Sequence, residues 1–147
     1  MMLKIKWSDR FCVNLPEIDE QQKQIIERIN DIVDAVNSST DQKEIYDMIS
    51  ELTDFVRHRF SQEEKSMVEC NFPDHLHHRK DHREFIRKII MFRKMFADES
   101  ATVKDDFIKL IEEWLVHHCE AWDGNYAPYV RLHRYVEECN VGKKRSR

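Results

Sequence analysis

The stretch HRKDHREFIRKIIMFRKMF, residues 78–96, decides the fold that the sequence predicts. Its apolar side chains recur at intervals of three and four residues, which places them along one face of an α-helix. These side chains are Phe85, Ile86, Ile89, Ile90, Phe92 and Phe96. The preceding Pro73 suits a helix start, so one long helix is expected over about residues 74–97.

Three further stretches carry the same helical periodicity on either side of this one. They cover roughly residues 18–37, 41–69 and 102–121, and a shorter helix is expected after Gly124. Two glycines and three prolines in 147 residues leave few turns, which argues against an all-β fold. Long helices with short connections predict an all-α, up-down-up-down four-helix bundle. We expect a single domain over residues 1–147: an N-terminal arm (1–16), the bundle (17–121), and a short helix with a basic tail (122–147).

Composition excludes several classes of protein. Hydrophobic residues make up 41% and charged residues 35%, and no apolar run is long enough to cross a membrane. The net charge of −4 does not favour a broad nucleic-acid-binding face. The N-terminus lacks the apolar segment of a signal peptide, so a cytoplasmic location is expected, with the four cysteines as reduced thiols.

Polar residues interrupt the apolar stripes only at certain points, and these points converge. The start of the first helix, the end of the second, the start of the third and the end of the fourth share one end of an antiparallel bundle. The interrupting residues all fall there: Gln22, Arg59, Glu63, His78, His82 and His118, with Asp123 just beyond the fourth helix. Buried ionisable groups are costly unless they are paired or bind a metal, so the cluster predicts a metal site.

The residue types suit that chemistry. His78 and His82 are four residues apart on one helical face, which lets two imidazoles reach one ion. His118 offers a third nitrogen, and Glu63 and Asp123 offer two carboxylates. Taken alone, each of these residues is more often a solvated or structural side chain; together they favour metal binding. The other histidines are expected to be non-ligands: His58, His75, His77, His117 and His133.

These motifs resemble those of hemerythrins, especially the bacterial ones, over nearly the whole chain. The resemblance rests on Trp7, EIDEQQK (17–23), FSQEEKSM (60–67), the pair His78 and His82, and WLVHH (114–118) followed by Asp123 and Tyr126. It implies a four-helix bundle with two irons, bridged by a Glu, an Asp and an oxygen. Carried over by position, the three-histidine iron falls on His78, His82 and His118, with Glu63 and Asp123 as carboxylates. The two histidines of the other iron would fall where this chain has Gln22 and Arg59.

A one-metal site follows from this departure. One divalent ion, two carboxylates and one arginine carry the same total charge as two divalent ions, two carboxylates and a hydroxide. Arg59 can therefore replace the charge of a second ion, and its planar head suits Glu63 or Asp123; the alternative is that it extends to solvent. Gln22 can hydrogen-bond a carboxylate oxygen or a water on the ion. Iron is favoured by the resemblance, with Mn and Zn as alternatives.

Three functions remain open from the sequence. The first is mononuclear non-heme iron redox chemistry on a small molecule (oxygen, peroxide, nitric oxide or a small organic substrate), aided by Arg59 and Gln22 and fed by an outside electron donor. Whether such a protein is an oxidoreductase stays open. The second is a sensor or binding module for oxygen, nitric oxide or iron. The third is a di-iron oxygen binder with unexpected ligands.

Overall fold

A computed structural model describes residues 4–97 and 101–145; the side chains of residues 95, 97, 101–107, 121–124 and 143–145 are not part of that description. The elements are η1 (Asp9–Phe11), α1 (Pro16–Asn37), α2 (Gln42–Glu69), α3 (His75–Ala97), α4 (Ala101–His117), η2 (His118–Asp123) and α5 (Gly124–Arg145). The described residues contain no strand. The prediction of an all-α helical bundle is confirmed.

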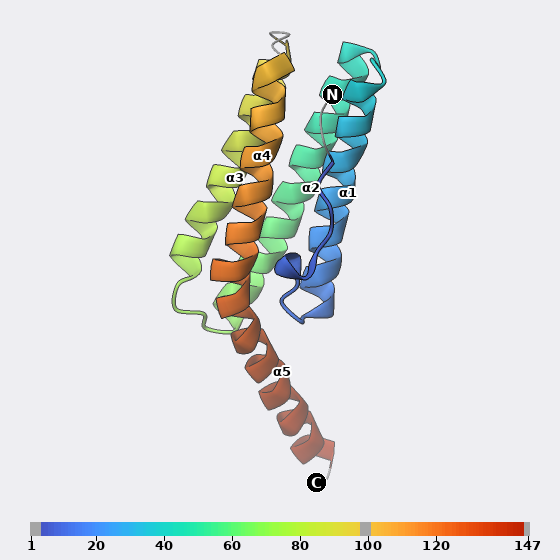
Figure 1. Ribbon diagram of the computed structural model, residues 1–147. Helices are drawn as coiled ribbons and strands as arrows, with labels where there is room; N and C mark the ends of the chain where they lie inside the picture. Colours follow the sequence, from blue (N-terminus) through green and yellow to red (C-terminus); the bar gives the residue numbers. More distant parts are fainter. Residues whose placement is uncertain (1–3, 98–100, 146–147) are drawn as a thin grey trace.

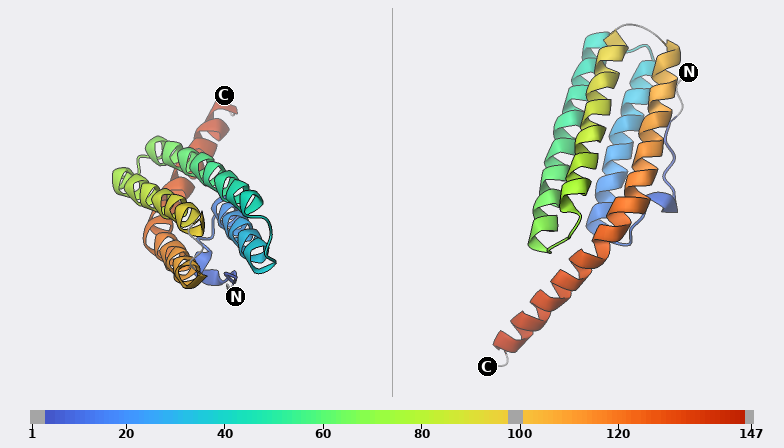
Figure 2. Two further views of the ribbon diagram at one scale, coloured as in Figure 1. Left: turned by 90° about the horizontal axis from the view of Figure 1, so that it is seen from above. Right: turned by 90° about the vertical axis from the view of Figure 1, so that its left-hand side faces the viewer.

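Helices α1 to α4 run side by side in alternating directions (Figure 1), and the view from above shows them grouped around one core (Figure 2). The N-terminal arm lies against the bundle and is held by Asn30 of α1. The Asn30 side chain accepts a hydrogen bond from Ile5 N and donates one to Ile5 O, each 2.8 Å long. Among the described residues, none of the helices combines the length and the apolar character that crossing a bilayer requires.

The interior consists of two apolar clusters. The larger fills most of the bundle and includes Ile25, Phe60, Phe85 and Leu115, one from each main helix. The smaller lies at the end where the arm, the α2–α3 turn and α5 meet. It comprises Val13, Leu15, Ile18, Met67, Cys70, Phe72, Tyr126, Ala127 and Val130. Burial of these side chains supplies the main favourable term in folding.

The C-terminal part differs from the expectation. The fourth helix was expected to continue to about residue 121, but α4 ends at His117 and passes into η2, a π-helical segment. Helix α5 was expected to be short, yet its 22 residues equal the length of α1. It continues past the bundle as a projecting rod (Figure 1). Its outer half buries little apolar surface, so the burial pattern that predicted the other helices is weak there.

Candidate metal centre

A layer of buried polar side chains separates the two apolar clusters. On α2, Glu63 lies between Phe60 of the larger cluster and Met67 of the smaller one. On α1, Gln22 lies between Ile25 and Ile18 in the same way. The layer contains Gln22, Glu63, His78, His82 and His118, whose exposed fractions range from 0% to 7%. Five of the predicted polar interruptions are therefore part of the interior, whereas Arg59 is half-buried and the Asp123 side chain lies outside the described part of the chain.

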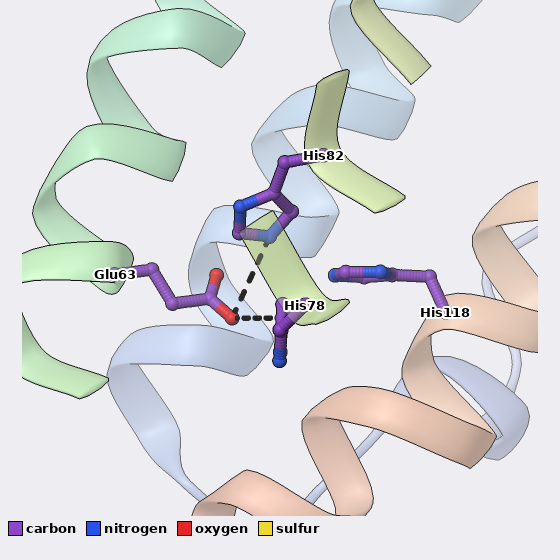
Figure 3. A group of neighbouring side chains, drawn as sticks. All are labelled: Glu63, His78, His82 and His118. Atoms are coloured by element: carbon purple, nitrogen blue, oxygen red, sulfur yellow. Dashed lines mark ion pairs between the residues drawn. The ribbon is translucent and has the colours of Figure 1, made fainter. Parts of the chain in front are cut away.

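Four side chains of this layer point toward one another (Figure 3). Glu63, His78, His82 and His118 each offer a ligand atom, and these atoms all lie within 4.8 Å of one another. Glu63 Oε1 lies 2.9 Å from His78 Nε2 and 3.8 Å from His82 Nε2. The structure thus brings together four of the five predicted metal ligands.

The helices explain this geometry. Because His78 and His82 are one turn apart on α3, their rings meet edge to face with centroids 4.6 Å apart. His118, the first residue of η2, brings its ring to 4.8 Å from that of His78 and 4.9 Å from that of His82. Glu63 approaches from α2. Three helices contribute to one small group, a geometry that depends on the whole bundle.

Aromatic rings of the larger cluster hold two of the imidazoles. Phe60 stacks on His82 with centroids 3.7 Å apart and planes 5° apart. Trp114 stacks on His118 at 4.6 Å and 13°, and Phe85 stacks on Trp114 at 4.2 Å. Such packing restricts each imidazole to one orientation and keeps water out of the layer.

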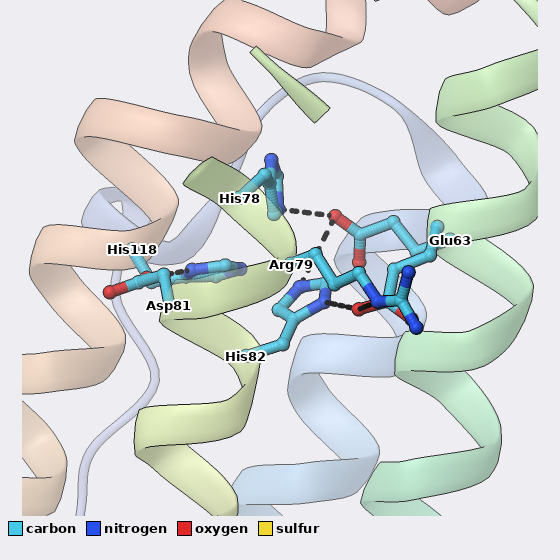
Figure 4. A network of polar contacts seen from close by, with 7 residues as sticks. Glu63, His78, Arg79, Asp81, His82 and His118 are labelled. Carbon is cyan, nitrogen blue, oxygen red and sulfur yellow. Dashed lines mark hydrogen bonds and ion pairs between the residues drawn. The ribbon is translucent and has the colours of Figure 1, made fainter. Parts of the chain in front are cut away.

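Carboxylates outside the group lie beside the far nitrogens of two histidines, and the Asp81 carboxylate is hydrogen-bonded to His118 (Figure 4). Asp81 Oδ2 lies 2.6 Å from His118 Nδ1, and Glu64 Oε1 lies 3.4 Å from His82 Nδ1. A carboxylate that accepts the Nδ1 proton leaves the Nε2 lone pair for a metal and raises its basicity. Burial raises the pKa of the Glu64 carboxyl, although Arg79 and Arg83 act in the opposite direction.

Sequence reasoning missed both outer carboxylates. A signal was present, because Asp81 directly precedes His82 and Glu64 directly follows Glu63. Since Asp81 also lies three residues after His78, helical geometry brings it near the same face of α3.

The donor set fits a transition-metal ion. Three imidazoles and a carboxylate, all buried, suit iron, manganese or zinc better than the all-oxygen environment that calcium or magnesium prefers. Four ionisable groups in one dry layer would be costly without a cation to share. The outer carboxylates add the arrangement that commonly orients metal-binding histidines.

The remaining predicted site residues have different outcomes. Asp123 ends η2, and its side chain lies outside the described part of the chain. Gln22 is buried in the layer. Arg59 is half-buried: its NH2 donates to Gln24 Oε1 at 2.9 Å, and its guanidinium lies over the Phe55 ring at 5.1 Å. The expected pairing of Arg59 with Glu63 is not among its described contacts, because the long side chain reaches α1 instead.

The histidines expected to be non-ligands lie apart from the group. His58 and His117 are exposed. His77 is also exposed, with Nδ1 3.7 Å from Asp74 Oδ1. His75 Nδ1 lies 3.1 Å from Phe72 O at the start of α3. His133 Nε2 pairs with Glu137 within α5 at 3.2 Å.

Comparison with known proteins finds relatives that match most of the chain. A family model described as the hemerythrin HHE cation binding domain matches residues 13–130. A bacteriohemerythrin of Pseudomonas aeruginosa is 31% identical over 130 residues, which cover 88% of this chain and 84% of the relative. A hemerythrin-like protein of Naegleria fowleri is 32% identical over 120 residues, covering 82% and 88%. A bacteriohemerythrin of Stenotrophomonas maltophilia is 26% identical over 132 residues, covering 90% and 85%.

Proposed function

The chain belongs to the hemerythrin family, and from that premise we propose that it is a mononuclear non-heme iron protein. Iron is the metal of this family, and the buried His/Glu group is suited to hold it. The proposed ligands are Glu63, His78, His82, His118 and Asp123. The proposal concerns the number of ions, which we take to be one in each chain.

The observation that carries this proposal is that positions 22 and 59 hold no histidine. The positions at which the family resemblance expects the second pair of histidines hold Gln22 and Arg59. Gln22 is a neutral amide inside the layer, and Arg59 is a permanent cation beside it. A cation repels a second metal ion and an amide binds iron poorly, so this side of the layer favours a single ion.

The π-helical segment supports Asp123 as a ligand. Residues five apart lie about 140° apart around an α-helix of 3.6 residues per turn. A turn closed by i→i+5 hydrogen bonds is wider and brings such residues closer to one face. Since η2 begins at His118 and ends at Asp123, it favours a joint approach of the two residues to one ion.

The chemistry that we propose takes place on a small molecule. Ferrous iron held by these histidine and carboxylate ligands would supply one-electron redox chemistry for a small molecule. A cavity of about 140 Å³ between α1, α2 and α5 reaches Glu63 and gives a small ligand a route to the layer. Arg59 Nε is buried without a described acceptor, so it is available to donate to a bound anion or oxygen. Turnover would need an outside electron donor.

Metal analysis of the purified protein tests the ion count. We expect about one iron per chain, and two tightly bound irons would overturn the proposal. The matched variant is Gln22→His combined with Arg59→His, which restores both nitrogens and should raise the count toward two. His58→Ala, on the exposed side of α2, is the control and should leave the count unchanged.

A sensor or binding module for oxygen, nitric oxide or iron is the second candidate. The projecting rod of α5 favours it, because Tyr126 at the root of α5 contacts His78 with ring centroids 5.8 Å apart. Steady-state assays with a reductant and oxygen, peroxide or nitric oxide separate the candidates. Sustained turnover supports the redox protein, whereas stoichiometric binding without turnover supports the sensor.

A further inference from the structure

A second and larger cavity lies between α2 and α3, on the outer side of the metal layer. Its volume is about 380 Å³, within the range of small-molecule sites. His82 and Glu64 form part of its wall, so it adjoins the layer from outside the ligand group. The proposed iron chemistry makes no use of this cavity.

The cavity is strongly basic. Four arginines line it, Arg57 from α2 and Arg79, Arg83 and Arg87 from successive turns of α3, against the single carboxylate of Glu64. Within the described part of the chain, the only ion pair of these arginines is a long one, Arg79 Nε to Glu64 Oε1 at 4.0 Å. A local excess of positive charge on a chain of net charge −4 favours an anionic ligand.

The floor of the same cavity is apolar. Phe60, Ile86 and Ile90 line it below the arginines. Phe60 is buried and Ile86 and Ile90 are half-buried, so an apolar body placed there would cover hydrocarbon surface. A bare inorganic anion would use only the arginines, whereas an organic acid with an apolar body would use both surfaces.

We propose that this cavity binds a small organic carboxylate whose acid group pairs with the arginines and whose apolar body packs on Phe60, Ile86 and Ile90. Arginine suits this role because its planar head binds a carboxylate through two parallel hydrogen bonds. The ligand lies against the face of the site formed by His82 and Glu64, away from the route that reaches Glu63.

Anion binding in this cavity is coupled to metal binding in the layer. The coupling rests on the proposed function, whereas the anion site does not. The carboxylate lies near Glu64, which contacts His82 Nδ1 at 3.4 Å, and it competes with Glu64 for Arg79. A cation in the layer attracts an anion in the cavity, so each raises the affinity for the other by the same factor. The cavity would therefore bind its anion more tightly in the metal-loaded protein than in the metal-free one.

Titration calorimetry with benzoate tests the site, first on metal-free and then on iron-loaded protein. Benzamide serves as the neutral isostere and inorganic phosphate as the anion without an apolar body. We expect saturable binding of benzoate, weaker binding of phosphate and none of benzamide. Arg83→Gln should weaken benzoate binding about tenfold, a typical loss for one charge-assisted contact. Lys94→Gln, which removes an exposed charge of α3 away from the cavity, should not.

The outcomes separate the site from the coupling. The proposal would be overturned if Arg83→Gln left the benzoate affinity unchanged or if phosphate bound as tightly as benzoate. Binding of poly-glutamate in place of benzoate would also overturn it, and would assign the arginines to an acidic protein partner. Benzoate binding in metal-free protein supports the site even if the iron count contradicts the proposed function. An affinity that rises several-fold on iron loading supports the coupling, and an unchanged one overturns it.

Discussion

The polar layer has two unlike halves. On the α3–α4 side, three imidazoles occupy it, and on the α1–α2 side, Gln22 and Glu63 do so, with Arg59 nearby. The imidazoles of His82 and His118 are held by stacked rings and outer carboxylates. Arg59, by contrast, reaches Gln24 through a long flexible side chain.

The difference shows where the geometry of the site is specified. The His118 imidazole is stacked on Trp114 and hydrogen-bonded at Nδ1 to Asp81, so its Nε2 lone pair has one place. An arginine with four rotatable bonds can reach several partners, and here it reaches one on α1. The α3–α4 half therefore supplies the three imidazoles of the site, and in the proposed function the residues of the α1–α2 half would limit it to one ion.

The largest effect should come from a ligand of the α3–α4 half. His118→Ala removes a fully buried nitrogen ligand. Because mutating a residue that only orients a ligand usually lowers metal affinity 10- to 100-fold, we expect iron affinity here to fall by more than roughly a hundredfold. His117→Ala changes the exposed neighbour and should keep the affinity of the parent protein. Competition with a chelator measures both; equal losses would mean that His118 is not a ligand.

A smaller effect should follow from an outer carboxylate. Asp81→Asn keeps the size of the side chain but removes the charge that holds His118 Nδ1 at 2.6 Å. We expect iron affinity to fall about 10- to 100-fold and the absorption bands of the ferric site to shift. Asp74→Asn is the control, because the described contact of the Asp74 side chain is with exposed His77, at 3.7 Å, and the substitution leaves the backbone carbonyl that accepts from His78 N in place. A parent-like spectrum and affinity for Asp81→Asn would show that Asp81 does not position the ligand.

The smallest effect on the metal should come from Arg59, next to the α1–α2 half. Arg59→Met retains the apolar stem but loses the bond to Gln24 and the contact with Phe55. We expect a loss of about 1 kcal/mol in unfolding free energy, with the iron count still one. Chemical denaturation of Arg59→Met, Gln24→Ala and the double variant should reveal coupling between the two residues. A loss of iron on changing Arg59 would contradict this division of the layer.

Periodicity was sufficient to predict the bundle, because apolar residues such as Ile25, Phe85 and Leu115 must face a common core. It was not sufficient beyond His117. A π-helical turn depends on how the last turn of α4 packs, which no spacing of apolar residues encodes. The length of α5 was missed because Leu132, Tyr135 and Val136 are exposed, so local helical hydrogen bonds rather than burial extend the rod.

The candidate site was partly predictable for a related reason. The helix backbone determines closely where buried side chains such as His78 and Glu63 lie. The bundle topology was therefore enough to predict that they meet. The end of Arg59 could not be deduced, since its position depends on which partner the long side chain selects. The role of Asp81 was hidden because a charged residue on a charged helix resembles ordinary solvated surface.

The layer between the two apolar clusters also has a consequence for how the chain unfolds. One ion held by Glu63, His82 and His118 would join α2, α3 and α4 at a point where apolar contact is interrupted. Because the unfolded chain has no preformed site, the binding free energy of the ion would add to the free energy of unfolding. Loss of the ion should then loosen the polar layer before the two apolar clusters, so that melting begins at the site.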